Sequence, residues 1–422
     1  WLVDNTSRSA TLRGQVSNAV RGFYSGPSST PGEAPDRLLS VVVDYGDQPP
    51  TTLPEPTSIA AEVSLAFDKL GQGSGDSAAT FATLSSVIDK YAPYRTQQKR
   101  EVMFVLVTAQ RGSDWEQAEA PIAALKKLII PVYVIGWPAP LGKAELDNKA
   151  QTDLGPESRY KEAIELESLT GGYDLEFMDS GFGPFPLEWL ARATDGRFVA
   201  LRPTYEQSGF GGPLAMSWPN SQALQFDARV MKKYAPDYVS EAKYQEILQG
   251  NAACRALHQA AKLPRAEART QLRTQFAKRS EAQFATELGR AQQDVARLEP
   301  AVEALYDALA AGEGDRAKLT SARWQVEYDI AMGRACAVKA RLDGYNAMLA
   351  MLKNGKSFEK ATSTSWRIQP SATTQAGSAL TKLVERSQLY LKRVADEHPG
   401  TPWAALAQRE LETLVGWEWV EE

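Results

Sequence analysis

The first half of the chain is organised by the segment from Arg100 to Trp137, which reads REVMFVLVTAQRGSDWEQAEAPIAALKKLIIPVYVIGW. Residues 102–107 form an unbroken apolar run, which is typical of a strand that is buried on both faces. A stretch with helical spacing of its apolar residues follows, and then a second apolar run. Strand, helix and strand at this spacing predict one right-handed crossover unit of a parallel sheet. Because ligands bind at the carboxyl ends of such strands, we expect any site near Thr108 or Gly136.

The same pattern extends on both sides of this segment. Leu2-Val3 is predicted to be the end of a strand, residues 38–43 a second buried strand and residues 196–201 the last one, with helical spacing between them. This order predicts an α/β fold over residues 1–205, a doubly wound, mostly parallel sheet of the Rossmann-like kind. A polar, turn-rich insertion is expected at 138–180.

The second half of the chain is predicted to be all helical. Residues 206–226 are rich in Gly, Pro and Ser and predict a linker, which leaves 227–422 as the helical domain. Tyr238–Leu263 is predicted to be one helix, and a long hairpin is expected at about residues 265–353. Each arm would be about 45 Å long at a rise of 1.5 Å per residue, with a kink or restart at Pro300. The first arm carries a heptad seam formed by Phe284, Leu288, Ala291, Val295, Leu298, Val302, Leu305 and Leu309.

The C-terminal part is predicted to hold one more pair of helices. Residues 354–377 are polar and rich in Ser and Thr, and we expect them to form a connection. The helix pair follows within residues 378–415, with its joint at 398–401. The last residues, Gly416–Trp419, are expected to fold back as a hydrophobic clasp, the alternative being an exposed aromatic anchor for a partner.

Composition limits the classes of function. The 422 residues suggest two or three domains, and a net charge of −5 without a broad basic field argues against nucleic-acid binding. No apolar stretch reaches the roughly 20 residues of a membrane span. His258 and His398 lie in helical sequence away from any nucleophile motif, which argues against histidine-dependent catalysis and a zinc site. Cys254 and Cys336 either form one disulfide or, as we favour, remain two buried free thiols.

Several local features together resemble a von Willebrand factor type A domain. They are the strand that leads into Asp4-x-Thr6, a two-helix connection through Gly75, the strand that ends at Thr108, and the strand at 132–136. The sequence at 155–157 (Gly-Pro-Glu) and at 180–184 (Ser-Gly-Phe-Gly-Pro) is similar to a subgroup of this family found in large bacterial envelope proteins. The resemblance covers roughly the first half of the chain.

The resemblance raises the question of a metal site. Members of the family often hold a divalent cation through an Asp-x-Ser-x-Ser loop, a threonine in the two-helix connection, and an aspartate after the central strand; oxygen ligands of this kind suit a hard cation. The chain keeps Asp4, has Thr6 at the first serine position, and places Arg8 at the second. Ala109 stands where the aspartate is expected. The connection offers Asp76 but no clearly placed threonine.

Two interpretations of these residues stay open. In the first, Asp4, Thr6 and Asp76 form a rewired site for Mg²⁺ or another divalent cation. In the second, which we favour, the loop is vestigial and binds no cofactor, and Asp4 accepts backbone hydrogen bonds or pairs with Arg8 or Arg111. A fixed positive charge beside a divalent cation is unfavourable, and losing a carboxylate ligand removes most of the affinity for a hard cation.

The sequence therefore predicts a non-enzymatic protein that binds a protein partner or serves as a scaffold. The resemblance implies a place at the bacterial cell envelope, periplasmic or extracytoplasmic. The hairpin is expected to act as a spacer or, in the manner of a coiled coil, as the arm of a homo-oligomer. One alternative is a divalent-metal-dependent adhesion module. Another is an accessory part of a larger enzyme or complex, since the chain begins at Trp1 inside a predicted strand and we expect an upstream region.

Overall fold

The computed structural model of the chain describes most of its residues. The predicted insertion 138–180 lies outside the described residues except for 138, 139, 141, 155–160 and 180, and the predicted linker 206–226 except for residue 226. The described ranges are 1–24, 38–70, 75–139, 141, 155–160, 180–201, 226–263, 272–355, 357–373 and 377–422.

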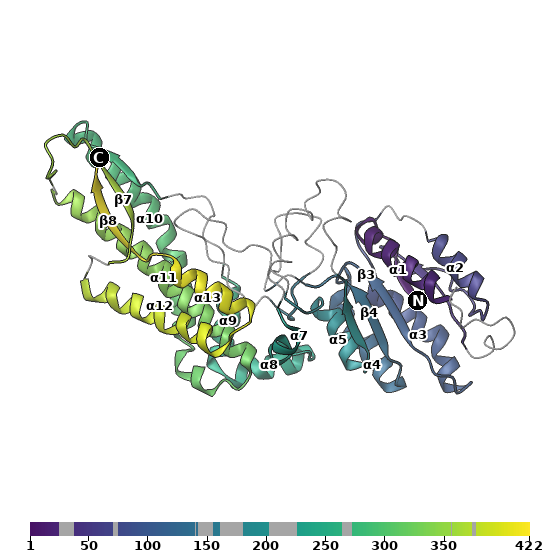
Figure 1. The fold of residues 1–422 in the computed structure, drawn as a ribbon. Helices are drawn as coiled ribbons and strands as arrows, with labels where there is room; N and C mark the ends of the chain where they lie inside the picture. Colours follow the sequence, from purple (N-terminus) through teal and green to yellow (C-terminus); the bar gives the residue numbers. More distant parts are fainter. Residues whose placement is uncertain are drawn as a thin grey trace. The chain divides into compact units, whose positions relative to one another are not determined.

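These residues form two compact units (Figure 1). The first unit contains the described residues up to Tyr160, those at 180–201 and the short segment Pro236–Glu241. The second contains 226–235 and the described residues from Ala242 to Glu422. The segment Pro236–Glu241 therefore belongs to the first unit, although it follows the predicted linker.

A five-stranded parallel sheet forms the centre of the first unit, with the strand order β2-β1-β3-β4-β5. The chain places β2 on one side of β1 and the three later strands on the other, which is a doubly wound order. The prediction of an α/β fold with a parallel sheet is thus confirmed. The strands are β1 (Leu2–Asp4), β2 (Val43–Tyr45), β3 (Phe104–Thr108), β4 (Val132–Gly136) and β5 (Arg197–Ala200).

Helices cover both faces of this sheet (Figure 1). Successive strand residues point to opposite faces, so Leu106 packs in the core with α3, α4 and α5, while Val107 packs with α1 and α2. Both faces are apolar at β3 and β4, which is why these two strands read as continuous apolar runs. The helices are α1 (Ala10–Tyr24), α2 (Ala60–Asp68), α3 (Thr80–Thr96), α4 (Glu119–Leu128) and α5 (Phe185–Ala193), with 3-10 turns η1 (Ser7–Ser9) and η2 (Trp115–Gln117).

The segment Pro236–Glu241 is held against α5 by cation–π contacts, ring stacking and hydrogen bonds. The guanidinium of Arg159 lies 4.8 Å from the ring centroid of Phe185 and donates a hydrogen bond to the backbone oxygen of Val239 at 2.8 Å. The ring of Tyr238 stacks on Phe185 with centroids 6.0 Å apart. Tyr160 donates its hydroxyl to a carboxylate oxygen of Glu241 at 2.5 Å. These contacts make the segment an integral part of the first unit.

The turn before β5 holds a glycine that cannot be enlarged. A Cβ on Gly196 would lie 1.9 Å from the backbone oxygen of Val132 on the neighbouring strand. Gly196→Ala should therefore displace β5 and lower the free energy of unfolding by about 1–3 kcal/mol. Gly14→Ala is the control, because that position on α1 is exposed with open space around it, and alanine there should stabilise by about 0.5–1 kcal/mol. Hydrogen exchange of the β4 and β5 amides measures the change in the free energy of unfolding for both variants. If Gly196→Ala and Gly14→Ala changed it equally, the prediction would be contradicted.

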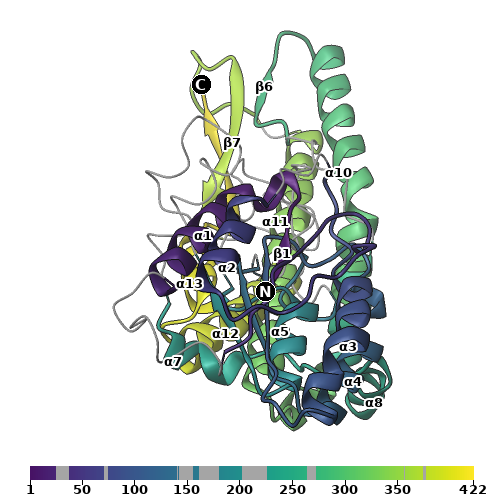
Figure 2. The same cartoon turned by 90° about the vertical axis from the view of Figure 1, so that its right-hand side faces the viewer.

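The second unit is built around a long helical hairpin (Figure 2). Its arms are α10 (Glu281–Ala310) and α11 (Ala322–Lys353), joined through the 3-10 turn η5 (Glu313–Lys318). All eight residues of the predicted seam on α10 are buried, as expected. The predicted start at residue 265 is wrong for the helix itself, because a strand precedes Glu281. The helix continues through Pro300, so no restart occurs there. Proline has no N–H to donate to the carbonyl one turn earlier, and because Pro300 is exposed, that carbonyl can face water.

α11 is the central helix of this unit rather than the outer arm of a simple hairpin. It packs against α10, α12, α13 and the last strand, and most of its 32 residues are buried. The predicted terminal helix pair is present as α12 (Gly377–Glu397) and α13 (Pro402–Glu412). Two shorter helices, α7 (Ala228–Met231) and the 3-10 turn η4 (Lys232–Tyr234), begin the unit.

The single helix predicted at Tyr238–Leu263 is wrong. The chain forms α8 (Glu241–Gly250) and α9 (Ala252–Ala261) instead. The break lies at Asn251, whose side-chain oxygen accepts hydrogen bonds from the backbone N–H groups of Ala253 and Cys254. Asparagine in this position starts a new helix, because it satisfies amides that a continuous helix would have bonded to the preceding turn.

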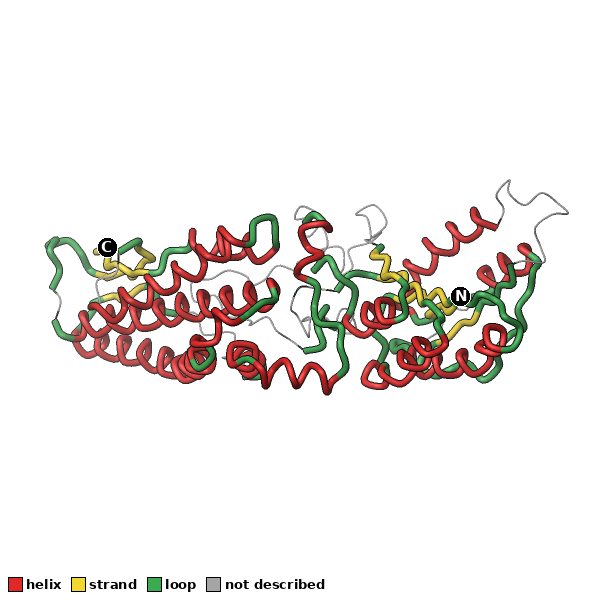
Figure 3. The backbone as a smooth tube through the Cα atoms, turned by 90° about the horizontal axis from the view of Figure 1, so that it is seen from below, coloured by secondary structure: helices red, strands yellow, loops and turns green. Residues whose placement is uncertain are grey.

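The expectation of an all-α second half also needs correction. Three antiparallel strands, β6 (Gln275–Ala277), β7 (Ser365–Ser371) and β8 (Gly416–Glu421), form a small sheet in that order. Figures 2 and 3 show it near the C-terminus of the chain, alongside the long helices. The predicted clasp is β8, in which Trp417 is buried and donates its indole N–H to the backbone oxygen of Arg341 at 2.8 Å.

Two further expectations concern the whole chain. Cys254 and Cys336 are both buried and free, so the thiol interpretation holds and the disulfide does not form. Burial raises the pKa of the Cys336 thiol to about 11. None of the helices that the structure describes is long and apolar enough to cross a membrane.

Candidate functional site

The predicted site lies at the carboxyl edge of the parallel sheet. β1 ends at Asp4 and β3 ends at Thr108, and the two strands are neighbours because Val3 pairs with Val107. The turn η1, directly after β1, brings Ser9 back over the same edge. Asp4, Thr108 and Ser9 are all buried, with exposed fractions of at most 1%. Residues that are far apart in the sequence thus meet at one closed position.

Both carboxylate oxygens of Asp4 accept hydrogen bonds from the protein. Oδ1 accepts from the backbone N–H of Thr6 at 2.9 Å. Oδ2 accepts from the hydroxyl of Ser9 at 2.6 Å and from the hydroxyl of Thr108 at 2.8 Å. Such charge-assisted bonds are short and strong, and a metal ion would have to compete with them, because they use three of the roughly four lone-pair sites of the carboxylate.

The surrounding hydroxyl groups are occupied as well. The Ser9 oxygen accepts from the backbone N–H of Ala109 at 2.9 Å, so the residue at the expected aspartate position contributes its amide instead. The side-chain amide of Gln110 donates to the Thr6 hydroxyl oxygen at 2.7 Å, and its backbone N–H donates to Thr108 at 3.1 Å. Gln110 is 2% exposed. An ion that used the Thr6 oxygen would have to displace this amide.

A buried cation balances the charge of Asp4. Arg13 on α1 donates from one guanidinium nitrogen to the backbone oxygens of Asp4 at 3.0 Å and Thr6 at 3.2 Å. Burial lowers the pKa of Arg13 below its ordinary value, and the charge of Asp4 opposes that shift. On the other side, burial raises the pKa of Tyr45 well above its usual range, with the Asp4 charge acting in the same direction. The network therefore carries its own positive charge.

Asp76, the third predicted ligand, and Asp114, which follows β3, have different places. Asp76 is exposed, and its carboxylate accepts from the Ser7 hydroxyl at 3.0 Å, so it lies beside the Asp4 loop but bonds to a different residue. Asp114 accepts from the backbone N–H groups of Phe81 and Ala82, at 3.2 and 2.7 Å, and so caps the start of α3. Of the predicted ligands, the network contains Asp4 and Thr6.

Sequence reasoning missed Ser9, Arg13, Gln110 and Thr80. Thr80 is the first residue of α3, fully buried, and its hydroxyl lies 3.3 Å from that of Tyr45. The available signal was its position at the start of a helix that follows the Gly75 connection. No comparable signal marks Arg13, because its role depends on the way that α1 crosses the end of β1.

A polar hollow of about 510 Å³ adjoins this edge beyond β2, and Asn5, Asp44 and Asp47 are among its lining residues. Asn5 donates its side-chain amide to Asp44 at 3.4 Å. Within the described ranges, no group of three or more His, Cys, Asp or Glu side chains is arranged to hold a metal ion. The hollow therefore adds two carboxylates but no complete ligand set.

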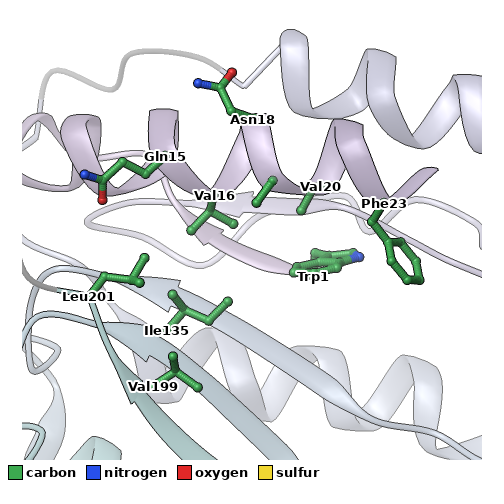
Figure 4. Close-up of a pocket in the computed structure, with 10 residues that line it drawn as sticks. Trp1, Gln15, Val16, Asn18, Val20, Phe23, Ile135, Val199 and Leu201 are labelled. Carbon is green, nitrogen blue, oxygen red and sulfur yellow. The ribbon is translucent and has the colours of Figure 1, made fainter. Parts of the chain in front are cut away.

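An apolar groove of about 680 Å³ lies between α1 and the strands β4 and β5 (Figure 4). Phe23 is 67% exposed and Val199 is 40% exposed, so the groove carries apolar side chains at the surface. Exposed apolar surface of this kind is typical of places where proteins bind one another. The groove is lined by Trp1, Gln15, Val16, Asn18, Ala19, Val20, Phe23, Ile135, Val199 and Leu201.

In comparisons with known proteins, no family model, curated protein or solved structure matches the chain. The molecule is defined by its architecture, a parallel α/β unit with a closed polar network at its carboxyl edge and a largely helical unit with a long hairpin.

Proposed function

We propose that this chain is a non-enzymatic interaction or scaffold protein whose sheet unit, similar to a von Willebrand factor type A domain, works without a metal ion. The observation that carries the proposal is the occupation of Asp4. Its two oxygens accept three protein hydrogen bonds at 2.6–2.9 Å, and the charge of Arg13 lies beside it. A divalent cation would have to compete with these bonds and enter beside a fixed positive charge, which is unfavourable.

Two further features support a protein partner as the ligand. The groove beside α1 exposes apolar side chains, and among the described residues no group of three or more His, Cys, Asp or Glu side chains is arranged to hold a metal ion. In the helical unit, the seam of α10 is buried within the same chain, since α10 packs on α11. We therefore assign the hairpin a spacer role, and oligomers would have to form through its other faces. The cell-envelope location remains part of the proposal and rests on the resemblance alone.

Calorimetric titration of the full chain with Mg²⁺, Mn²⁺ and Ca²⁺ tests the proposal. We expect no saturable heat up to millimolar concentrations and no shift in the thermal unfolding temperature, because the oxygen ligands are already bonded. Asp76→Asn shows whether any binding uses this candidate ligand, since Asp76 is exposed and its change leaves the Asp4 network intact. One-to-one binding that Asp76→Asn abolishes would refute the metal-free proposal and favour a metal-dependent adhesion module instead.

A further inference from the structure

The joint between α12 and α13 contains a buried histidine. His398 follows the last residue of α12 and is 3% exposed. Its Nδ1 atom lies 3.0 Å from the hydroxyl of Tyr234, which is itself completely buried. Its Nε2 atom is also buried, and it has no hydrogen-bond partner in the part of the chain that the structure describes. The imidazole thus has one satisfied nitrogen and one unsatisfied nitrogen.

Tyr234 is one of the two buried residues through which the segment 226–235 is held on the rest of the second unit. Its ring centroid lies 5.4 Å from that of Trp403 on α13 and 5.6 Å from that of His398. Its backbone oxygen accepts a hydrogen bond from Arg323 on α11 at 3.3 Å. Met231 is the other fully covered apolar anchor of this segment, at 2% exposed. The attachment therefore depends on few side chains.

Protonation of His398 would be costly in this setting. A charged imidazolium carries N–H on both nitrogens, so Nε2–H would be a buried donor without an acceptor, beside a desolvated charge. Lys233 of η4 and Arg316 of η5 disfavour the charged form, whereas Asp329 of α11 and Glu397 of α12 favour it. Burial dominates and lowers the pKa of His398 below its ordinary value.

We propose that the contact between Tyr234 and His398 is an acid-sensitive latch, in which proton uptake by the imidazole loosens residues 226–235 from α12 and α13. The released histidine has the ordinary pKa of about 6.5, and the attached one has a lower pKa. Attachment is therefore strongest above a pH of about 6.5 and weakens as the pH falls below that value, with a ceiling of about tenfold per pH unit in the opening equilibrium. This inference is independent of the proposed function, because it concerns the second unit and no metal ion.

Hydrogen exchange of the full chain at pH 7.5 and pH 5.5, corrected for the intrinsic exchange chemistry, tests the latch. We expect amides of 226–235 to open several-fold more at pH 5.5, up to about tenfold, while amides of β7 and β8 keep their protection. His398→Asn retains a hydrogen-bonding group near Tyr234 but cannot take up the proton, so it should abolish the pH effect. The matched control is His258→Gln, which alters the other buried histidine and should leave the effect in place.

Equal protection at both pH values would overturn the latch, as would a loosening that persists in His398→Asn. A second measurement needs no variant of His398 to fold. The chain has two histidines, so the imidazole signals of the wild-type protein can be followed by NMR, with His258→Gln for assignment. We expect His398 to titrate below a pH of about 6.5, and titration at or above that value would refute the proposal.

Discussion

Asp4→Ala should lower the free energy of unfolding of the first unit by about 3–5 kcal/mol, the cost typical of breaking a buried ionic network by removing one partner. The hydroxyls of Ser9 and Thr108 and the backbone N–H of Thr6 would lose their acceptor in the protein interior. Arg13, 7% exposed, would keep its charge without the carboxylate beside it. Hydrogen exchange of the β1 and β3 amides in the full chain measures the effect on this unit alone.

The neighbouring aspartate provides the matched control. Asp44 lies on β2, one strand away from Asp4, but its side chain is exposed and receives one hydrogen bond of 3.4 Å from Asn5. Asp44→Ala should change the free energy of unfolding by no more than about 0.5 kcal/mol, as is usual at the surface. If both substitutions had the same small effect, the network around Asp4 would not be what holds the carboxyl edge together.

Asp329→Ala should lower the free energy of unfolding of the second unit by about 3 kcal/mol. Asp329 is fully buried on α11 and accepts two hydrogen bonds from Arg316, at 2.9 and 2.5 Å, and one from Arg393 at 3.3 Å. Its bond to Arg316 raises the pKa of that guanidinium above the usual value. We expect the lower end of the range for buried ion pairs, because the two arginine side chains are 15% and 26% exposed and water screens them in part.

Glu397→Gln separates the role of Asp329 from that of general surface charge. Glu397 lies 3.9 Å from the same Arg316, but its side chain is 57% exposed. Its loss should cost less than about 1 kcal/mol. Exchange of the α11 and α12 amides reports both variants, and a cost for Glu397→Gln as large as that for Asp329→Ala would show that burial is not the deciding factor.

The sequence predicted those parts of the fold in which one periodicity extends over many residues. The apolar runs of β3 and β4 gave the parallel sheet, and the seam from Phe284 to Leu309 gave the buried face of α10. The small sheet was missed because β7 lies in a polar, Ser- and Thr-rich segment and its partners are far away in the sequence. Its alternation becomes recognisable only when Trp366 and Trp417 are seen to be buried.

The candidate site was predictable only in part, for a related reason. Asp4 and Thr6 are marked by local sequence, and a vestigial loop in which Asp4 accepts a backbone hydrogen bond was the favoured interpretation. Ser9, Arg13 and Gln110 complete the network through long-range pairing of β1 with β3 and through the crossing of α1. Spacing in one sequence cannot identify such partners, because it carries no information on which loops share a sheet edge.

The way in which Arg159 and Phe185 hold Pro236–Glu241 has a consequence for the synthesis of the protein. Chains emerge from the ribosome with the N-terminal end first, and domains fold as they become complete. The described strands of the sheet unit end at Ala200, yet Tyr238 and Glu241 still belong to this unit. Its last contacts therefore form only after Glu241 has left the ribosome, when α7 of the second unit has already been synthesised.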